Sequence, residues 1–276
     1  MELLNATLLA LLQGVTELFP VSSLGHAVLV PAVLHWNVDL RSPEFLPFLV
    51  AIHFGTALAL LLYFWRDWLA FARAVIAFRD PAGKTERRIF LFVCIATIPA
   101  VLVGAVLEKL VREAFAQPLV AASFLIVNGL VLLIAERLKS RGTRPLEAMS
   151  VKNALLIGLA QCLAFIPGMS RSGVTLAAGL AAGHDHEASA RFSFLLGTPI
   201  IIGATVHEAP KFLHSGAAWQ TPTLVAWLVA GVTAYASIAF LMRYFRRHDF
   251  DALNPFAYYC FAVGAIALGL LLTHVV

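Results

Sequence analysis

The chain has 276 residues, of which 60% are hydrophobic and only 13% are charged. With a mean hydropathy of +0.84, this composition excludes a water-soluble single domain and predicts a membrane protein. The formal net charge is +4, but the basic residues lie in loops between apolar runs and form no aromatic-rich patch, so no nucleic-acid partner is expected.

The chain predicts an all-α polytopic membrane protein, a single integral membrane domain over 1–276 with about six transmembrane helices. A helical crossing takes roughly 20 apolar residues. Continuous apolar runs, as over 58–62, exclude a membrane β-barrel, whose strands alternate apolar and polar residues. The first apolar stretch, over 4–35, and a second, over 153–182, are each interrupted by Pro, Gly and Ser. The six predicted spans cover 45–65, 89–107, 118–136, 190–208, 223–243 and 255–275.

Lys and Arg residues predict how the chain is oriented in the membrane. Of the 20 such residues, fourteen lie in three connections, over 66–88, 137–152 and 243–250. Cytoplasmic loops carry an excess of basic residues, so these three connections are predicted inside and both termini outside. With this orientation, the two interrupted stretches become re-entrant helical hairpins that enter the membrane from opposite sides.

The two interrupted stretches also resemble each other in sequence. Gln13 precedes Pro20 and Gln161 precedes Pro167, and in both stretches a serine stands three residues after the proline. Further on, the dipeptide Gly-Thr at 55–56 recurs at 197–198. These matches predict an inverted-topology repeat, with halves of about 1–110 and about 150–276, whose hairpins meet near the midplane of the membrane.

The first break concentrates polar groups at membrane depth. A carboxylate and an imidazole are costly there, and non-helical backbone persists only where it is buried in protein or lines a wet cavity. Gln13 and Glu17 are four residues apart and share a helix face. Either of the following serines could simply cap the next helix, which is the structural alternative to a chemical role. The polar residues of this break are Gln13, Glu17, Ser22, Ser23 and His26.

The second break has the composition of an anion site. Backbone N–H groups at a helix N-terminus, several hydroxyls and a guanidinium fork match the oxygens of a phosphate in geometry and charge. The residues are Ser170, Arg171, Ser172 and Thr175. A structural ion pair between Arg171 and Glu17 is the alternative to phosphate binding. Facing Glu17, the break suggests a site for phosphate together with a metal ion.

The two breaks resemble the motifs of the undecaprenyl-diphosphate phosphatases of the bacitracin-resistance family. The resemblance covers essentially the whole chain and rests on ELFPVSSLGH over 17–26 and PGMSRSGVT over 167–175, together with FWR over 64–66, IPA over 98–100 and FSFLL over 192–196. It implies an integral protein of the bacterial cytoplasmic (inner) membrane. It also implies an enzyme that hydrolyses undecaprenyl diphosphate to undecaprenyl phosphate and phosphate, which recycles the lipid carrier for cell-wall synthesis and confers resistance to bacitracin.

The resemblance and the residues together predict an active site. The expected nucleophile is Ser23 with His26 as its base, and a water activated by His26 is the open alternative. Glu17, with the help of Gln13, is expected to bind Mg²⁺ or Ca²⁺. The catalytic residues predicted are Glu17, Ser23, His26 and Arg171, and the phosphate-binding residues are Ser170, Arg171, Ser172 and Thr175.

Three positions depart from the family pattern. Gln13 stands where some members have glutamate, which removes a negative charge but keeps an oxygen that can bind a hard cation. His53 stands where glutamine is expected and Arg191 where some members have an acidic residue, and their roles are left open. The expected partners are a polyprenyl diphosphate substrate and membrane lipids, while association into a homodimer and the face to which the site opens are left undecided.

Two other classes of protein compete with this interpretation. Inverted repeats with broken helices are also typical of secondary transporters, so a carrier or flippase of a lipid phosphate or anion is the main alternative. The second is the acid phosphatase superfamily, whose pattern needs a histidine about five residues after Ser-Arg. The first histidine after Arg171 is His184, so this class is rejected.

Overall fold

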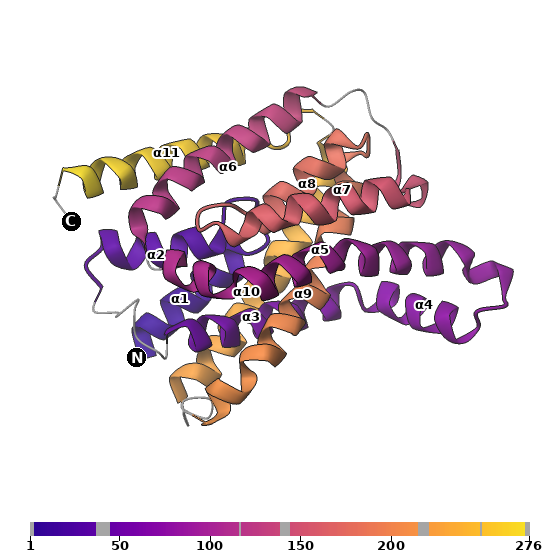
Figure 1. Cartoon of the computed structure of the whole chain (residues 1–276), viewed down its shortest axis with the longest axis horizontal. Helices are drawn as coiled ribbons and strands as arrows, with labels where there is room; N and C mark the ends of the chain where they lie inside the picture. The colour runs from indigo at the N-terminus through magenta and orange to yellow at the C-terminus, as the bar shows by residue number, and fades with distance from the viewer. Residues whose placement is uncertain are drawn as a thin grey trace.

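A computed structural model describes residues 3–36, 45–115, 117–138, 144–214, 221–248 and 250–273. Over these ranges the fold is all-α, and the only β-type pairing is an isolated bridge between Arg144 and His184. The helices cross one another in a single bundle, with α6 and α11 side by side along one edge (Figure 1). The predicted fold class is confirmed.

Five helices are long and apolar enough to cross a membrane. They are α5 (Lys84–Phe115), α6 (Pro118–Leu138), α9 (His186–His214), α10 (Thr221–Arg247) and α11 (Asn254–Leu272). Together with these, the pair α3 (Phe45–Tyr63) and α4 (Trp65–Ile76), bent by 72°, meets the same criterion as one unit, so the described residues hold five or six such spans. Each of the six predicted spans therefore falls on one of these helices, and the chain is a multi-pass membrane protein.

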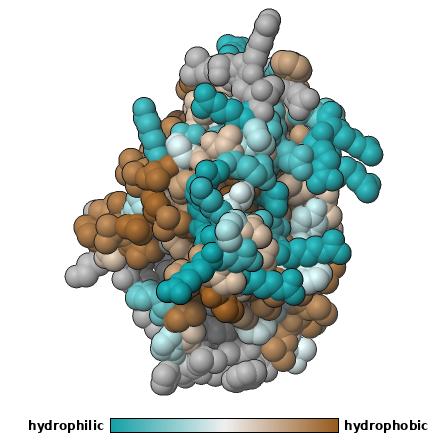
Figure 2. Space-filling model, turned by 90° about the vertical axis from the view of Figure 1, so that its right-hand side faces the viewer, coloured by the Kyte–Doolittle hydropathy of each residue, from teal (hydrophilic) through white to brown (hydrophobic). Residues whose placement is uncertain are grey.

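The predicted connection over 66–88 is wrong in part, because most of it is helical. It contains nearly all of α4, a 3₁₀ turn η1 (Pro81–Gly83) and the start of α5. Because the segment is rich in charge, the sequence predicts a loop, but α4 is an amphipathic helix. Phe71 and Ala74 are buried on one face of α4, while Arg66 and Arg73 are exposed. Figure 2 views this end of the molecule and shows hydrophilic side chains gathered across it, beside an apolar patch.

Both interrupted stretches consist of two short helices with a break between them. The first holds α1 (Leu3–Thr16) and α2 (Ser23–Val33). The second holds α7 (Val151–Gln161), a 3₁₀ turn η3 (Cys162–Phe165) and α8 (Arg171–Ala181). In each case the helix after the break begins at a serine cap: the hydroxyls of Ser22 and Ser170 accept hydrogen bonds from the N–H groups of Gly25 and Gly173. Their re-entry into the membrane, and the equivalence of the two halves, stay predictions.

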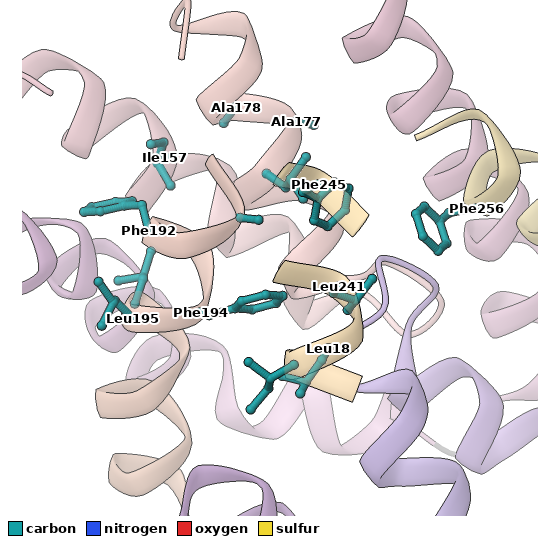
Figure 3. Packing of buried hydrophobic residues seen from close by; sticks show 14 of the residues in the cluster. Leu18, Ile157, Ala177, Ala178, Phe192, Phe194, Leu195, Leu241, Phe245 and Phe256 are labelled. Atoms are coloured by element: carbon teal, nitrogen blue, oxygen red, sulfur yellow. The ribbon is translucent and has the colours of Figure 1, made fainter. Parts of the chain in front are cut away.

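The core lies where α9 and α10 pass between the two breaks. Phe192, Phe194 and Leu195 of α9 are fully buried in one cluster with Leu241 of α10 and Leu18 of the first break. Phe194 points towards Leu241, while Phe192 and Leu195 point to the other side of α9 (Figure 3). Because lipid tails are as apolar as these side chains, their packing stabilises the bundle mainly through van der Waals contact. This packing fixes the positions of the two breaks relative to one another.

We expect cysteine labelling in intact cells to confirm the orientation. In a chain without its native cysteines, a cysteine at Lys84, in the basic end of α5, should be protected from an impermeant reagent, because cytoplasmic loops carry the excess of positive charge. A cysteine at the exposed Gln117, which precedes α6, should be labelled. The opposite pattern would reverse the orientation. The predicted positions Arg141 and Trp219 lie outside the described residues.

Candidate active site

Residues of both breaks line one cavity of about 270 Å³. Its polar lining includes Glu17 and Ser23 of the first break and Ser170 and Arg171 of the second. Apolar side chains of α3, α5, α9 and η3 line the rest. A cavity lined by both charged and apolar side chains suits a ligand with a charged head and an apolar tail.

Glu17 is the centre of the site. Its carboxylate is 8% exposed and is contacted by side chains from four different helices, α1, α2, α3 and α8. Oε1 faces Nη2 of Arg171 at 3.2 Å and Nε at 3.4 Å, while Oε2 lies 2.5 Å from the Ser23 hydroxyl and 3.2 Å from Nε2 of Gln13. His53 of α3 adds its Nε2 at 3.3 Å from Oε2. The carboxylate is therefore surrounded by donors, which compensate the cost of burying its charge.

Arg171 is held by hydrogen bonds from all three of its guanidinium nitrogens. Nη1 donates to the carbonyl of Ser193 at 3.1 Å, opposite the side that faces Glu17. Gly197 leaves the space that the group occupies, since a Cβ at this position would lie 2.4 Å from Nη1. The fork is thus oriented before any ligand arrives.

Ser23 begins α2 and its hydroxyl points at the carboxylate of Glu17. The preceding residue, Ser22, has a φ of 68°, a left-handed conformation that is unusual outside glycine. This turn lets the chain reverse between Glu17 and Ser23 within six residues, and the resulting hydrogen bond measures 2.5 Å. A hydroxyl this close to a carboxylate can pass its proton to it.

The ring nitrogens of His26 contact groups other than the Ser23 hydroxyl, and the pairing of these two residues stays a prediction. Nδ1 of His26 lies 2.7 Å from the Ser22 carbonyl, and Nε2 lies 2.8 Å from the hydroxyl of Tyr259 on α11. Both ring nitrogens are therefore engaged elsewhere, and the residue that contacts the Ser23 hydroxyl is Glu17. A catalytic role of His26 stays a prediction that this geometry does not support.

The predicted phosphate-binding hydroxyls divide into two groups. Ser170 and Arg171 line the cavity. Ser172 and Thr175 are turned into the protein: the Ser172 hydroxyl donates to the Phe19 carbonyl at 3.2 Å, and that of Thr175 donates to the Arg171 carbonyl at 2.8 Å. The Ser172 hydroxyl thus ties α8 to the first break, while that of Thr175 bonds within α8 and to Ser193 of α9. Direct binding of phosphate by them stays a prediction.

Asn128 joins the two breaks and was missed in the sequence. Its side-chain amide donates to the Pro20 carbonyl at 2.9 Å and accepts from the Ser170 N–H at 3.0 Å. Asn128 is fully buried in α6. A lone amide inside an apolar span was a signal of such a role, because polar groups in a membrane helix face protein partners.

The structure also answers the open question about two departures from the family pattern. His53 lies in the site and contacts Glu17, and its Nδ1 is 2.6 Å from the Leu49 carbonyl. Arg191 lies away from the cavity and forms an ion pair with Asp67 of α4. His53 is thus part of the site, and Arg191 ties α9 to α4.

The residues present fit a divalent cation only in company with a ligand. Among the described residues there is no group of three or more His, Cys, Asp or Glu side chains that could hold a metal. Beside Glu17, however, Oε1 of Gln13 is buried without a hydrogen-bond partner among those residues. One carboxylate and one amide oxygen match the few protein ligands that Mg²⁺ takes when phosphate oxygens complete its shell.

Comparison with known proteins agrees with this geometry. The model of the bacitracin resistance protein BacA family matches residues 6–266. The chain belongs to this family. A relative from Acidiphilium cryptum, named undecaprenyl-diphosphatase, is 53% identical over 96% of both chains. Another of the same name, from Granulibacter bethesdensis, is 51% identical over 97% of this chain and 96% of its own. A third, undecaprenyl-diphosphatase 2 from Chromobacterium violaceum, is 47% identical over 97% of this chain and 98% of its own.

We expect Asn128→Leu to destabilise this BacA-family chain. The change leaves the buried Ser170 N–H unpaired and the Pro20 carbonyl with only the distant thiol of Cys260, and each unpaired group costs about 1 to 3 kcal/mol. Thermal unfolding in detergent should show a lower midpoint. Ser123→Ala, which removes an exposed hydroxyl from the same helix, is the control and should change little. An unchanged midpoint for Asn128→Leu would contradict the role of Asn128 in joining the two breaks.

Proposed function

We propose that this chain hydrolyses undecaprenyl diphosphate to undecaprenyl phosphate and phosphate in the bacterial cytoplasmic membrane. The reaction would recycle the lipid carrier of cell-wall synthesis and confer resistance to bacitracin. One observation carries the proposal: the Ser23 hydroxyl lies 2.5 Å from the Glu17 carboxylate, beside Arg171, in a cavity that also has an apolar lining. The names of the relatives from Acidiphilium and Granulibacter support the same substrate.

In the first step the Ser23 oxygen attacks the terminal phosphorus while Glu17 takes the hydroxyl proton. A bond forms between the serine oxygen and phosphorus, and the bond from phosphorus to the bridging oxygen breaks. Undecaprenyl phosphate leaves with the electron pair. Glu17 replaces His26 in this assignment, because it is Glu17 that contacts the hydroxyl.

In the second step water attacks the phosphoserine. Its oxygen becomes part of the released phosphate, which also keeps both protons of the water, and the protonated Glu17 returns its proton to the serine oxygen as the bond to phosphorus breaks. Nucleophile and carboxylate are thereby regenerated. Glu17 therefore acts as the base in the first step and as the acid in the second, in line with microscopic reversibility.

Arg171 and the start of α8 would bind the terminal phosphate. A planar guanidinium can hold two oxygens at once, and the helix N-terminus favours negative charge. The fork is already aligned by Glu17 and the Ser193 carbonyl, so it meets the charge of the transition state with little reorganisation. Ser170, which lines the cavity at the same helix start, adds a hydroxyl to this group.

A bound Mg²⁺ or Ca²⁺ would supply charge neutralisation at the diphosphate. Glu17 and Gln13 Oε1 are the residues that would hold it, as the geometry above allows. Ser23 and Arg171 keep the roles given to them, the first transferring its proton and the second orienting the phosphate.

Purified protein in detergent tests the proposal against a transporter, which needs binding groups but no nucleophile. We expect phosphate release from undecaprenyl diphosphate, its loss in Ser23→Ala, and a phosphoserine at residue 23 after rapid quenching. Reaction in ¹⁸O-labelled water should place the label in the released phosphate. Turnover by Ser23→Ala at the native rate would exclude the serine nucleophile, and a protein without turnover would favour the carrier.

Arg171 should be the most sensitive position of the site. Loss of one preorganised donor costs roughly 10² to 10³ in rate in other enzymes, and we expect Arg171→Ala to lose at least this much in kcat. Arg171→Lys should not recover it, because lysine offers only a point charge. If the residue were only the structural partner of Glu17, the double variant Glu17→Gln, Arg171→Met would regain phosphate release as well as folding. Recovery of activity would therefore remove Arg171 from the reaction.

Chelation of divalent cations should abolish turnover, and so should Glu17→Ala. Gln13→Ala should keep partial activity, because an amide is a much weaker ligand than a carboxylate for a hard cation. The measurement is phosphate release across a titration with chelator, followed by addition of Mg²⁺ or Ca²⁺ in excess. Full turnover in saturating chelator would end the metal hypothesis and leave the serine mechanism intact.

A further inference from the structure

Gln161, the last residue of α7, is a buried amide with no protein partner. It is 2% exposed and lines the same cavity as Glu17 and Arg171. Neither Oε1 nor Nε2 has a hydrogen-bond partner among the residues that the structure describes, so reversing the amide would not satisfy it. Because buried polar side chains are nearly always hydrogen-bonded, such an amide points to something that enters the cavity.

Comparison with Gln13 shows why this amide is free. Gln13 occupies the corresponding place before the first break, and its Nε2 donates to the carboxylate four residues later, Glu17. Four residues after Gln161 stands Phe165, which has no acceptor. The same spacing on a helix therefore pairs one glutamine with the chain itself and leaves the other open to a ligand.

Gln161 shares the lining of the cavity with both apolar and polar side chains. Ala164 and Phe165, three and four residues further on, line the cavity together with it and belong to the apolar part. Ser23 and Arg171 belong to the polar part. A ligand that brings its charged head to Ser23 and Arg171 therefore enters a cavity that this amide also lines.

We propose that Gln161 binds the diphosphate of the lipid substrate, with Nε2 donating to a phosphate oxygen. The inference rests on the proposed function and adds a residue to it. A neutral amide can donate to an anionic oxygen without adding charge to a cavity that already contains Arg171 and Glu17. Gln161 is thus a substrate-binding residue supplied by the second break, in addition to Ser170 and Arg171.

Gln161→Leu tests this role, because leucine keeps most of the volume and removes both polar atoms. We expect kcat/KM for undecaprenyl diphosphate to fall roughly 10- to 100-fold, the usual effect of losing a hydrogen bond to a charged group. The thermal midpoint of the free protein should stay the same or rise, since the change removes a buried amide that has no partner. A purely structural glutamine would show the opposite, a lower midpoint.

Leu159→Ala is the matched control on the same helix. Leu159 is 61% exposed on the outer face of α7, and its truncation should leave kcat/KM unchanged. Gln161→Glu is a second variant, in which a negative charge faces the phosphate, and it should weaken binding more than leucine does. Native kcat/KM in both Gln161 variants would overturn the proposal and indicate that the amide binds only water.

A binding measurement separates this inference from the proposed function. The probe is farnesyl methylenediphosphonate, a lipid diphosphate analogue that cannot be hydrolysed, titrated against the full chain in detergent. If the wild type releases no phosphate but binds the probe at least tenfold more tightly than Gln161→Leu, the hydrolase proposal fails and Gln161 remains a diphosphate ligand. If turnover is normal and both proteins bind the probe equally, the role of Gln161 fails alone.

Discussion

The ion pair between Glu17 and Arg171 is the interaction on which the rest of the structure depends. The two residues are 154 positions apart, and each stands in a break of an otherwise apolar stretch. Neither charge is tolerable at membrane depth without the other, so the breaks must meet. The serine caps and Asn128 form hydrogen bonds with backbone groups that the breaks expose. Gly197 leaves room for the guanidinium group.

The same pair explains how a stable site can also be reactive. Glu17 accepts from four side chains, which is more stabilisation than one carboxylate needs, and Arg171 still has a face directed at the cavity. An entering phosphate can therefore share the guanidinium while the serine, the histidine and the amide continue to hold the carboxylate. Because the donors are fixed by the fold, the charge of the transition state meets an environment that has no need to reorganise.

Sequence reasoning located this pair because charges inside apolar stretches stand out, and the six spans followed from length and hydropathy. It did not show side-chain contacts that depend on which helices pack together. Tyr259, which occupies the imidazole of His26, lies 233 residues away, and His53 reaches Glu17 only because α3 passes the first break. The helix α4 was missed for a different reason: its charges lie on one face, and a count of charges over the segment does not show periodicity.

The two breaks divide the chemistry between them. The first supplies the carboxylate and the hydroxyl, and the second supplies the guanidinium and the start of a helix. Both breaks line the same cavity, and Ile200, Ile201 and Ala204 of α9 line it as well. The free amide of Gln161 fits this division, since it adds a neutral donor to the break that binds the anion.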